Sequence, residues 1–409
     1  MSLYIDPGTG SMLFTVILSL ATAGLFAVRG VYSKVKLYVA KGKKVKTGGE
    51  TKKYQYVIYT DSKRYWNVFK PLCDEFERRG IPLHYMTQSE DDPFFKTSYK
   101  HITGEYIGNT NSAFAKLYFL DADTVISTTP SLDVYQWKRS KNVNRYVHIF
   151  HDLSDCTGYE MFGVDHYDDI IMTGRIQEKY IRELERMRNL KPKNLYLCGS
   201  VYIDDMVNKR KTYGEIKRES DKPTVLLAPS WGNNNIFHRM GEKMLEALVS
   251  TDYNIIVRPH PQTKQTEPEL LDALMAKFPE KENFHWDYSN NNFLTLAKSD
   301  LMITDYSGIT CDYAFVFDKP FLYADADFDL SAFDSYWFKE TTYRFQMVSK
   351  LGKQITKDQL DGLKDIIDDV MNNDKYAEGR EEVKKEIWAY QGEGIRRTVD
   401  CIVGEKANA

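Results

Sequence analysis

From residue 55 onward, short runs of apolar residues alternate with longer stretches in which apolar residues recur at helical spacing. In the first half of the chain this pattern predicts helices that include 67–79 and 175–189. The apolar runs predict strands at 55–60, 81–86, 124–128, 145–150, 169–173 and 194–198.

The second half repeats the alternation. Helices are predicted at 235–250, 267–277, 291–298 and 307–317, and strands at 224–228, 254–258, 284–286, 301–304 and 321–323. Continuous apolar strands that alternate with helices are typical of parallel sheets covered on both faces. We therefore expect an α/β protein with two Rossmann-like domains, 47–215 and 216–350, that face each other across a cleft. The remaining residues, 351–409, are expected to form helices that pack back on both domains.

The segment before these domains is apolar and then basic. Residues 12–28 carry no charge, and seven Lys and Arg residues follow between positions 29 and 46. This order predicts an N-terminal transmembrane helix within 1–46, with a basic juxtamembrane segment that stays in the cytoplasm. A cleavable signal peptide would carry its positive charge before the apolar run, where Asp6 is the only charged side chain. A half-inserted hairpin or an interfacial helix is the remaining alternative.

Composition excludes several classes of protein. The 55 basic and 58 acidic residues give a net charge of -3, which does not suggest a nucleic-acid binder. The five cysteines are far apart and form no CxxC pair, so reduced thiols are expected rather than a disulfide framework or a zinc site. No metal-binding cage is evident, although a Mg²⁺ ion held mainly by substrate phosphates would leave little trace in a sequence.

Polar side chains follow three predicted strands of the second half. Ligands of open parallel sheets bind outside the carboxyl ends of the strands. The residues at these ends are Ser230 and Trp231 after the first strand, Arg258 and His260 after the second, and Asp305, Ser307 and Gly308 after the third.

The turn at Ser307 and Gly308 opens a predicted helix directly after a strand. Free backbone N–H groups and the helix dipole there favour a phosphate, and Gly308 permits close approach to the backbone. Asp305 is placed to orient a ribose or glycerol hydroxyl. The alternative is an ordinary helix cap, because Ser and Asp are favoured at such positions anyway.

His260 stands between two prolines, which stiffen its loop. With Arg258 beside it, the imidazole suits a pyrophosphate, since both side chains can donate to phosphate oxygens as charge builds on a leaving group. The alternative is a histidine that only binds loop backbone.

In the first half, His151 follows the strand predicted at 145–150, whereas His148 lies inside that strand. We expect His151 to act as a general base oriented by Asp152 or Asp155. The alternative is a surface-loop histidine. His148 and His151 do not form a credible metal pair, because their spacing on a strand places them on opposite faces.

The stretch 301–320, LMITDYSGITCDYAFVFDKP, resembles the signature block of the CDP-glycerol glycerophosphotransferases, which include teichoic acid primases and polymerases. Residues 258–261 (RPHP) resemble the second histidine motif of that family. Residues 228–231 (APSW) resemble the motif that opens its carboxyl-terminal domain, and 197–200 (LCGS) correspond to its glycine turn. The resemblance covers about 123–329.

This resemblance implies a GT-B fold in which an acceptor domain, 47–215, faces a nucleotide-donor domain, 216–350. An acceptor hydroxyl would attack the β-phosphate of the donor, and CMP would leave. His151 matches the family's first histidine, a candidate general base. The positions that match its donor side are Arg258 and His260 at the pyrophosphate, Ser307 and Gly308 at a phosphate, Asp305 and Asp312 as acidic positions of the signature block, and Ser230 and Trp231 beside them.

Two positions depart from the family pattern. The family follows its first histidine with Gly-Thr-Pro and a lysine, whereas this chain has Asp152-Leu-Ser-Asp155. The signature usually reads Asp-Tyr-Ser-Ser, whereas here Gly308 ends the motif. The first departure lies where the acceptor and the general base are expected to meet.

The resulting expectation is a transferase on the cytoplasmic side of a bacterial cell membrane. It would pass glycerol phosphate, or another polyol phosphate, from a CDP-activated donor to a lipid-linked or glycan acceptor in cell-envelope polymer synthesis. One alternative is a GT-B glycosyltransferase or epimerase-like enzyme that uses a UDP-sugar, because strand-end chemistry does not distinguish the base. Another is a nucleotide-binding scaffold without catalysis.

Overall fold

The computed structural model describes residues 53–214, 216, 220–233, 235–289, 291–325 and 330–404. The transmembrane helix predicted within 1–46 lies outside these residues. Within the described ranges, no helix combines the length and the apolar character that crossing a membrane requires.

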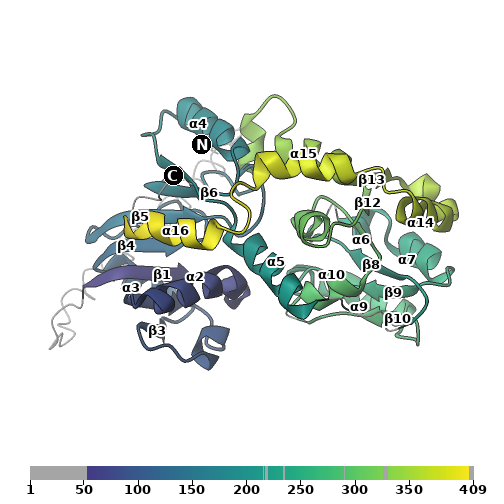
Figure 1. The fold of residues 1–409 in the computed structure, drawn as a ribbon, viewed down its shortest axis with the longest axis horizontal. Coiled ribbons are helices and arrows are strands. Elements are labelled where there is room, and N and C mark those ends of the chain that lie inside the picture. Colours follow the sequence, from purple (N-terminus) through teal and green to yellow (C-terminus); the bar gives the residue numbers. More distant parts are fainter. Residues whose placement is uncertain are drawn as a thin grey trace, which may run out of the picture. The chain divides into compact units, whose positions relative to one another are not determined.

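The first domain is built on a parallel sheet of seven strands with helices on both faces (Figure 1). The strand order is β3-β2-β1-β4-β5-β6-β7, so the direction of winding reverses between β1 and β4. The strands are β1 (Tyr54–Thr60), β2 (Leu83–Thr87), β3 (Ile102–Tyr106), β4 (Ala122–Ser127), β5 (Val143–Ile149), β6 (Asp169–Met172) and β7 (Asn194–Leu197). The helices are η1 (Lys63–Tyr65), α2 (Trp66–Arg79), η2 (Pro93–Lys96), α3 (Asn111–Tyr118), α4 (Ile176–Arg188) and α5 (Val201–Tyr213).

The second domain has a parallel sheet of six strands in the order β10-β9-β8-β11-β12-β13. Its strands are β8 (Thr224–Ala228), β9 (Asn254–Val257), β10 (Phe284–Trp286), β11 (Leu301–Thr304), β12 (Phe321–Ala324) and β13 (Gly352–Ile355). Its helices are α6 (Ile236–Arg239), α7 (Gly241–Val249), α8 (Thr263–Thr266), α9 (Pro268–Lys277), α10 (Phe293–Lys298), α11 (Ile309–Cys311), η3 (Asp312–Val316), η4 (Asp334–Trp337), α12 (Tyr343–Gln346), α13 (Val348–Leu351), η5 (Lys357–Gly362) and α14 (Leu363–Asn372).

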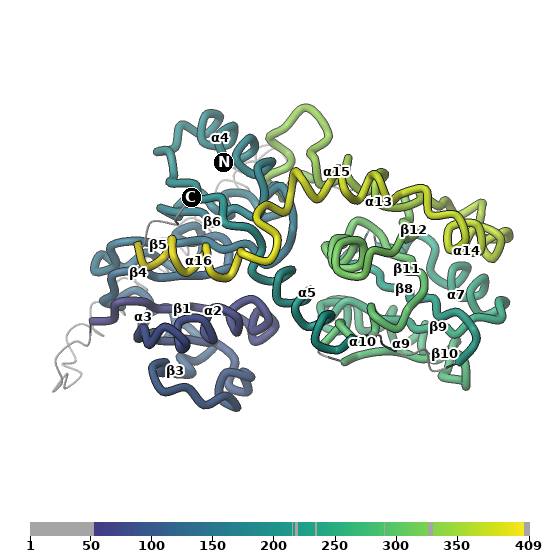
Figure 2. Tube along the Cα trace, viewed as in Figure 1, coloured from purple at the N-terminus to yellow at the C-terminus, as the bar shows by residue number. Residues whose placement is uncertain are grey.

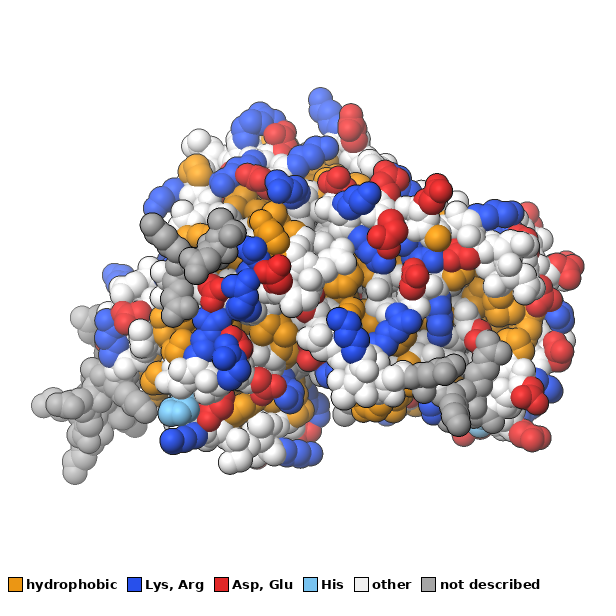
Figure 3. Space-filling view, viewed as in Figure 1, with side chains coloured by type: hydrophobic (Ala, Val, Ile, Leu, Met, Phe, Trp, Pro, Cys, Tyr) orange, Lys and Arg blue, Asp and Glu red, His pale blue; other side chains and the backbone are white. Residues whose placement is uncertain are grey.

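Each sheet has an apolar core on both faces, as the continuous apolar strands predict. Successive side chains of a strand point to opposite faces. In β8, Val225 and Leu227 therefore enter one core, whereas Leu226 and Ala228 enter the other. Lys, Arg, Asp and Glu side chains are intermixed over the outer face drawn in Figure 3, in keeping with the small net charge.

The structure differs from the sequence prediction at several elements. The edge strands β3 and β13 were not predicted, and β13 extends the second sheet past the boundary expected at residue 350. The helix predicted at 235–250 is two helices, α6 and α7, because the backbone turns at Gly241, where φ is +41°. The helix predicted at 307–317 is the short helix α11 followed by the π-helical turn η3.

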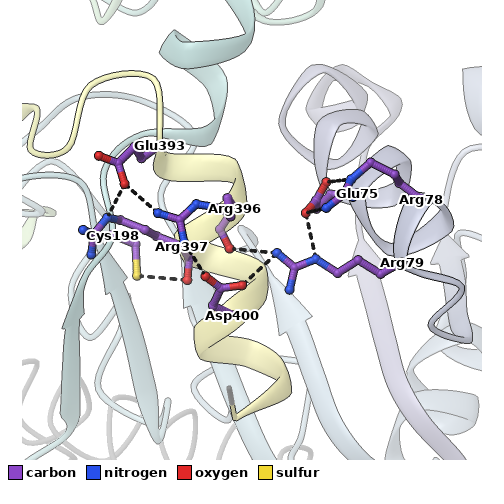
Figure 4. Close-up of polar contacts among 8 residues, drawn as sticks. All are labelled: Glu75, Arg78, Arg79, Cys198, Glu393, Arg396, Arg397 and Asp400. Carbon is purple, nitrogen blue, oxygen red and sulfur yellow. Dashed lines mark hydrogen bonds and ion pairs between the residues drawn. The ribbon is translucent and has the colours of Figure 1, made fainter. Parts of the chain in front are cut away.

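The C-terminal helices α15 (Ala377–Ile387) and α16 (Gly394–Val403) connect the two domains. Helix α15 packs against α13 and η3 of the second domain and against α4 of the first, and α16 packs against α2 and α5 (Figure 2). Figure 4 shows polar contacts on α16 and between α16 and α2, where Arg79 of α2 pairs with Asp400 of α16 at 2.7 Å and with Glu75 of its own helix at 2.7 Å. Within the described residues, α15 and α16 therefore contact elements of both domains.

The segment between α15 and α16 is fixed by one buried carboxylate. Asp204, in the first turn of α5, accepts hydrogen bonds from Trp388 Nε1 at 2.9 Å, from the Gly392 amide at 2.9 Å and from the Gly394 amide at 2.6 Å. Its side chain is buried, and burial raises the pKa of its carboxyl group. Three donors of the C-terminal segment thus depend on a single acceptor.

Replacing Asp204 with Ala is expected to lower the free energy of unfolding by about 2–4 kcal/mol, because buried donors lose their acceptor. Urea unfolding followed by tryptophan fluorescence measures the change. The matched control is Asp205→Ala, which removes a helix-surface ion pair with Lys209 and should cost at most about 1 kcal/mol. Equal losses in the two variants would contradict the role given to Asp204.

Candidate active site

A cleft of about 450 Å³ lies between the two domains, at the carboxyl ends of the central strands of both sheets. The wall from the first domain and α5 consists of Arg64, Tyr65, Asn67, Val68, His151, Asp152 and Tyr202. The wall from the second domain consists of Ala228, Pro229, Trp231, Arg258, Pro259, His260, Pro261, Asn292, Ser307, Gly308, Ile309 and Asp312.

The sheet order explains why these side chains meet. Strands β9, β8 and β11 are neighbours, so the residues that follow them reach one edge, as the strand-end pattern predicts. Strands β1, β4 and β5 are likewise neighbours in the first sheet. The residues that follow β1 and β5 therefore form the opposite wall of the cleft.

His151 is held in the wall by two hydroxyl groups. Its Nδ1 lies 3.1 Å from Thr128 Oγ1 and 3.5 Å from Tyr159 Oη, and its ring packs at 5.0 Å from Tyr65. Burial lowers the pKa of His151, and the nearby Asp152 carboxylate partly opposes this shift. A neutral imidazole results, which is the form that can accept a proton.

The prediction that a carboxylate orients His151 is wrong in its geometry. Asp155 accepts hydrogen bonds from Thr157 Oγ1 at 2.7 Å and from the Arg344 amide at 2.7 Å, and it does not reach the imidazole. Asp152 accepts from Ser154 Oγ at 3.3 Å and lies on the cleft wall. The orienting partner is the hydroxyl of Thr128, which follows β4, the strand next to β5.

His260 presents a defined tautomer. The Gln262 amide donates to His260 Nδ1 at 3.1 Å, so Nε2 carries the proton. Burial, with the positive charges of Arg64 and Arg258, lowers the pKa of His260 to about 4. His260 therefore does bind loop backbone, as the alternative interpretation of the sequence held. This contact uses Nδ1 and leaves the Nε2–H group as a neutral hydrogen-bond donor. The exposed ring of Trp231 lies 6.3 Å from the imidazole.

Arg258 lies on the cleft wall but is already bound. Its guanidinium pairs with Asp287 and donates to Ser289 Oγ at 2.9 Å and to the Ser289 carbonyl at 2.7 Å. The side chain is 9% exposed, which leaves little surface for a ligand. The structure therefore gives Arg258 mainly a wall position, with its charge acting on His260.

Asp305 and Ser230 do not line the cleft. The two carboxylate oxygens of Asp305 each accept from the Ser230 amide at 3.0 Å, and one accepts from the Ile236 amide at 3.2 Å. Asp305 is 1% exposed, and burial raises its pKa to about 6. In this arrangement Asp305 fixes the loop that carries Trp231 and the start of α6.

The two departures from the family pattern lie against each other. A Cβ atom added at Gly308 would stand 3.4 Å from Oδ2 of Asp152. Ser307 and Gly308 line the cleft, although the helix that they precede has only a short α-helical part. A carboxylate from the first domain therefore occupies the space beside the glycine of the second.

Asp312 reaches the cleft from the π-helical turn η3. Its carboxyl group accepts from Tyr202 Oη at 3.0 Å and from Asn292 Nδ2 at 3.3 Å. Burial raises the pKa of Asp312 to about 7, although these two hydrogen bonds oppose the shift.

The sequence pattern did not point to several residues of the wall, among them Arg64, Tyr65, Tyr202 and Asn292. Arg64 and Tyr65 follow β1 closely, so the strand-end rule could have found them if applied to the first strand. Arg64 also reaches across to the second domain, where its Nη1 lies 3.4 Å from Gln262 Oε1. Among the described residues, no group of three or more His, Cys, Asp or Glu side chains is arranged to hold a metal ion. The role of Mg²⁺ stays a prediction.

Because its pKa is lowered to about 4, folded His260 stays neutral at a pH where the unfolded chain, with the ordinary value of 6.5, is already protonated. His260 therefore costs stability as the pH falls from about 7 toward 4, by at most about 1.4 kcal/mol per pH unit. Asp312, whose pKa is raised, changes the stability in the opposite direction as the pH falls. The test therefore compares the wild type with a variant that lacks only His260. The unfolding free energy of His260→Gln should fall less steeply with acid than that of the wild type, and parallel curves would contradict the neutral assignment.

A family model described as CDP-Glycerol:Poly(glycerophosphate) glycerophosphotransferase matches residues 159–404, more than half of the chain. No curated protein sequence matches the chain. A solved structure of the wall teichoic acid polymerase TagF, from a CDPG soak, aligns with a TM-score of 0.55 at 17% identity and covers 86% of this chain and 88% of its own. A putative UDP-N-acetylglucosamine 2-epimerase from Listeria monocytogenes aligns with a TM-score of 0.55 at 15% identity, over 88% of this chain and 98% of its own.

At these identities the two structures show that the fold is GT-B-like, and the family model carries the assignment. The geometry agrees, because the signature block forms β11, α11 and η3 at the cleft. The chain belongs to the CDP-glycerol:poly(glycerophosphate) glycerophosphotransferase family and is a transferase of that type.

Proposed function

We propose that this protein transfers glycerol phosphate, or another polyol phosphate, from a CDP-activated donor to a hydroxyl of a lipid-linked or glycan acceptor, and releases CMP. The reaction takes place at the cytoplasmic face of the membrane to which the N-terminal segment attaches the chain. One observation carries the proposal: two neutral histidines, His151 and His260, stand on opposite walls of a single cleft.

The donor lies against the second domain. Trp231 offers an exposed ring, and the Nε2–H group of His260 donates to an oxygen of the pyrophosphate. Arg64 adds a positive charge from the opposite wall, and the backbone at Ser307 and Gly308 approaches a phosphate closely. Charge that develops on the departing CMP is thus met by donors that are already in place.

The acceptor hydroxyl approaches from the side of the first domain. With Nδ1 of His151 engaged by Thr128 and Tyr159, Nε2 is the nitrogen left to accept the proton of the hydroxyl. The acceptor oxygen bonds to the β-phosphorus, and the bond from that phosphorus to the bridging oxygen breaks. CMP leaves with that oxygen, and the acceptor's proton rests on His151.

Asp305 and Ser230 act by positioning rather than by contact. The Asp305 carboxylate binds the Ser230 amide and thereby sets the loop on which Trp231 meets the donor. Arg258 has a comparable role, since its charge helps keep His260 neutral in the free enzyme. Asp305, Ser230 and Arg258 thus have positioning roles, which do not require contact with the substrate.

The donor class is tested by incubating the full-length protein, in detergent or in lipid nanodiscs, with CDP-glycerol, CDP-ribitol or UDP-N-acetylglucosamine. Each donor is supplied with and without bacterial membrane lipid. We expect CMP release that depends on the lipid and on a CDP-polyol. Release of UDP alone would favour the sugar-transferase alternative, and donor binding without any turnover would favour a scaffold.

The roles of the two histidines are tested by His151→Gln and His260→Gln, which should each lower kcat for CMP release by about 100-fold or more. The control is His285→Gln, since His285 lies in β10 and is exposed. Thr128→Val should also lower kcat, while leaving the donor KM nearly unchanged. Wild-type turnover in both His151→Gln and His260→Gln would refute the assignment.

A further inference from the structure

The indole ring of Trp231 forms part of the cleft wall and has no polar partner. Trp231 is 51% exposed, and its Nε1 donates to no other residue that the structure describes. The neighbouring His260 ring, with its centroid 6.3 Å from that of the indole, does not cover it. A large aromatic ring that is held open to a cleft offers a surface on which a planar ligand can stack.

The loop that carries Trp231 is held by carboxylates on both sides of the ring. Before Trp231, the Ser230 amide donates to Asp305 at 3.0 Å. After it, the Gly232 amide donates to Oε1 of Glu267 at 2.6 Å. Gly232 has a φ of +92°, and nothing lies within 4 Å of an added Cβ, so a glycine is required there by the backbone conformation and not by the space. Both peptide groups next to Trp231 are therefore fixed.

Glu267 belongs to the segment of the chain that carries His260. It is the N-cap residue of α9, and its amide donates to the Thr263 carbonyl at 2.8 Å. The Thr263 amide in turn donates to the His260 carbonyl at 2.9 Å, and the prolines on either side of His260 stiffen this segment. The side chain of Glu267 therefore joins the loop of Trp231 to the segment of His260, which sets the separation of the two rings.

The carboxylate of Glu267 is enclosed and is not part of the cleft wall. Its side chain is 9% exposed. Besides the Gly232 amide, it accepts from His238 Nε2 at 2.8 Å and from Asn235 Nδ2 at 3.4 Å. Both oxygens are thus engaged by the protein, and hydrogen bonds to a charged acceptor are stronger than neutral ones. Glu267 can act on a ligand in the cleft only through the loop that it holds.

We propose that Glu267 is a positioning residue of the donor site, which holds the Trp231 ring in place as a stacking surface for the base of the nucleoside diphosphate. The inference rests on the proposed function and adds the group that prepares this surface. A base stacked on Trp231 lies beside His260, whose Nε2–H group donates to the pyrophosphate. Stacking uses the face of a base and does not distinguish one base from another. Trp231 therefore contributes equally to the binding of cytosine and uracil nucleotides.

Binding is measured by calorimetry on the full-length protein, with CDP as the probe that carries a base and inorganic pyrophosphate as the probe that lacks one. Glu267→Ala should weaken CDP binding about tenfold and leave the affinity for pyrophosphate unchanged. Glu267→Gln keeps an oxygen that can accept from the Gly232 amide, so it should retain most of the CDP affinity. The control is Glu269→Ala, since Glu269 is exposed in the first turn of the same helix. Unchanged CDP binding in Glu267→Ala, or an equal loss for both probes, would overturn the proposal.

A double variant tests whether Glu267 acts through Trp231. Trp231→Ala changes an exposed side chain and should also weaken CDP binding about tenfold, and adding Glu267→Ala should weaken it little further. Additive losses would reject the role given to Glu267. The same fold-changes are expected with UDP, and a loss confined to CDP would reject stacking on Trp231.

CMP release from CDP-glycerol is measured separately. If CDP binding depends on Glu267 and Trp231 but no CMP is released, the proposed function fails and the positioning role stands. If CMP is released but both variants bind CDP as the wild type does, the positioning role fails alone.

Discussion

The cleft depends on the two parallel sheets being held with their carboxyl ends toward each other. Asp204 secures the C-terminal crossing by accepting from three donors. A second connection is the buried Arg188 of α4, which binds Asp334 of the second domain as well as its own domain's Asp165. Because both connections are buried and polar, they specify one arrangement of the domains more sharply than apolar contact alone would. His151 and His260 share one cleft only in that arrangement.

The protonation states of His151, His260 and Asp312 are set mainly by burial and not by ion pairs. Both histidines are neutral because burial disfavours their charged forms, and burial likewise raises the pKa of Asp312 to about 7. A pyrophosphate entering this space would bring the negative charge that the free protein lacks near His260. Binding would then favour proton donation by His260, while His151, beside Asp152, remains suited to accept a proton. The same property, a buried imidazole, thus supports two roles because the neighbouring charges differ.

Sequence reasoning located the strands and the histidines because both depend on local pattern. β8, β10 and β11 have the predicted bounds, and Trp231, His260 and Gly308, which follow β8, β9 and β11, line the cleft. The edge strands β3 and β13 were missed because each is partly exposed and includes a glycine, which removes the apolar signal. The environment of Asp305 could not be predicted, since a carboxylate after a strand either faces the ligand or binds backbone amides. Tertiary packing decides which of the two a carboxylate does, and here Asp305 binds backbone amides. Packing likewise places Thr128 beside His151.

Arg344 marks the limit of local pattern more clearly. The amide of this residue binds a carboxylate 189 positions earlier in the chain, and nothing in the residues around it distinguishes it from a surface arginine. Its position follows from the docking of the domains. Asp152 and Gly308 line both the cleft and a narrow crevice beside Arg344, and they are the two places where the chain departs from its family's motifs. The two departures therefore meet in space, and the side chain that fits at position 308 depends on the carboxylate at position 152.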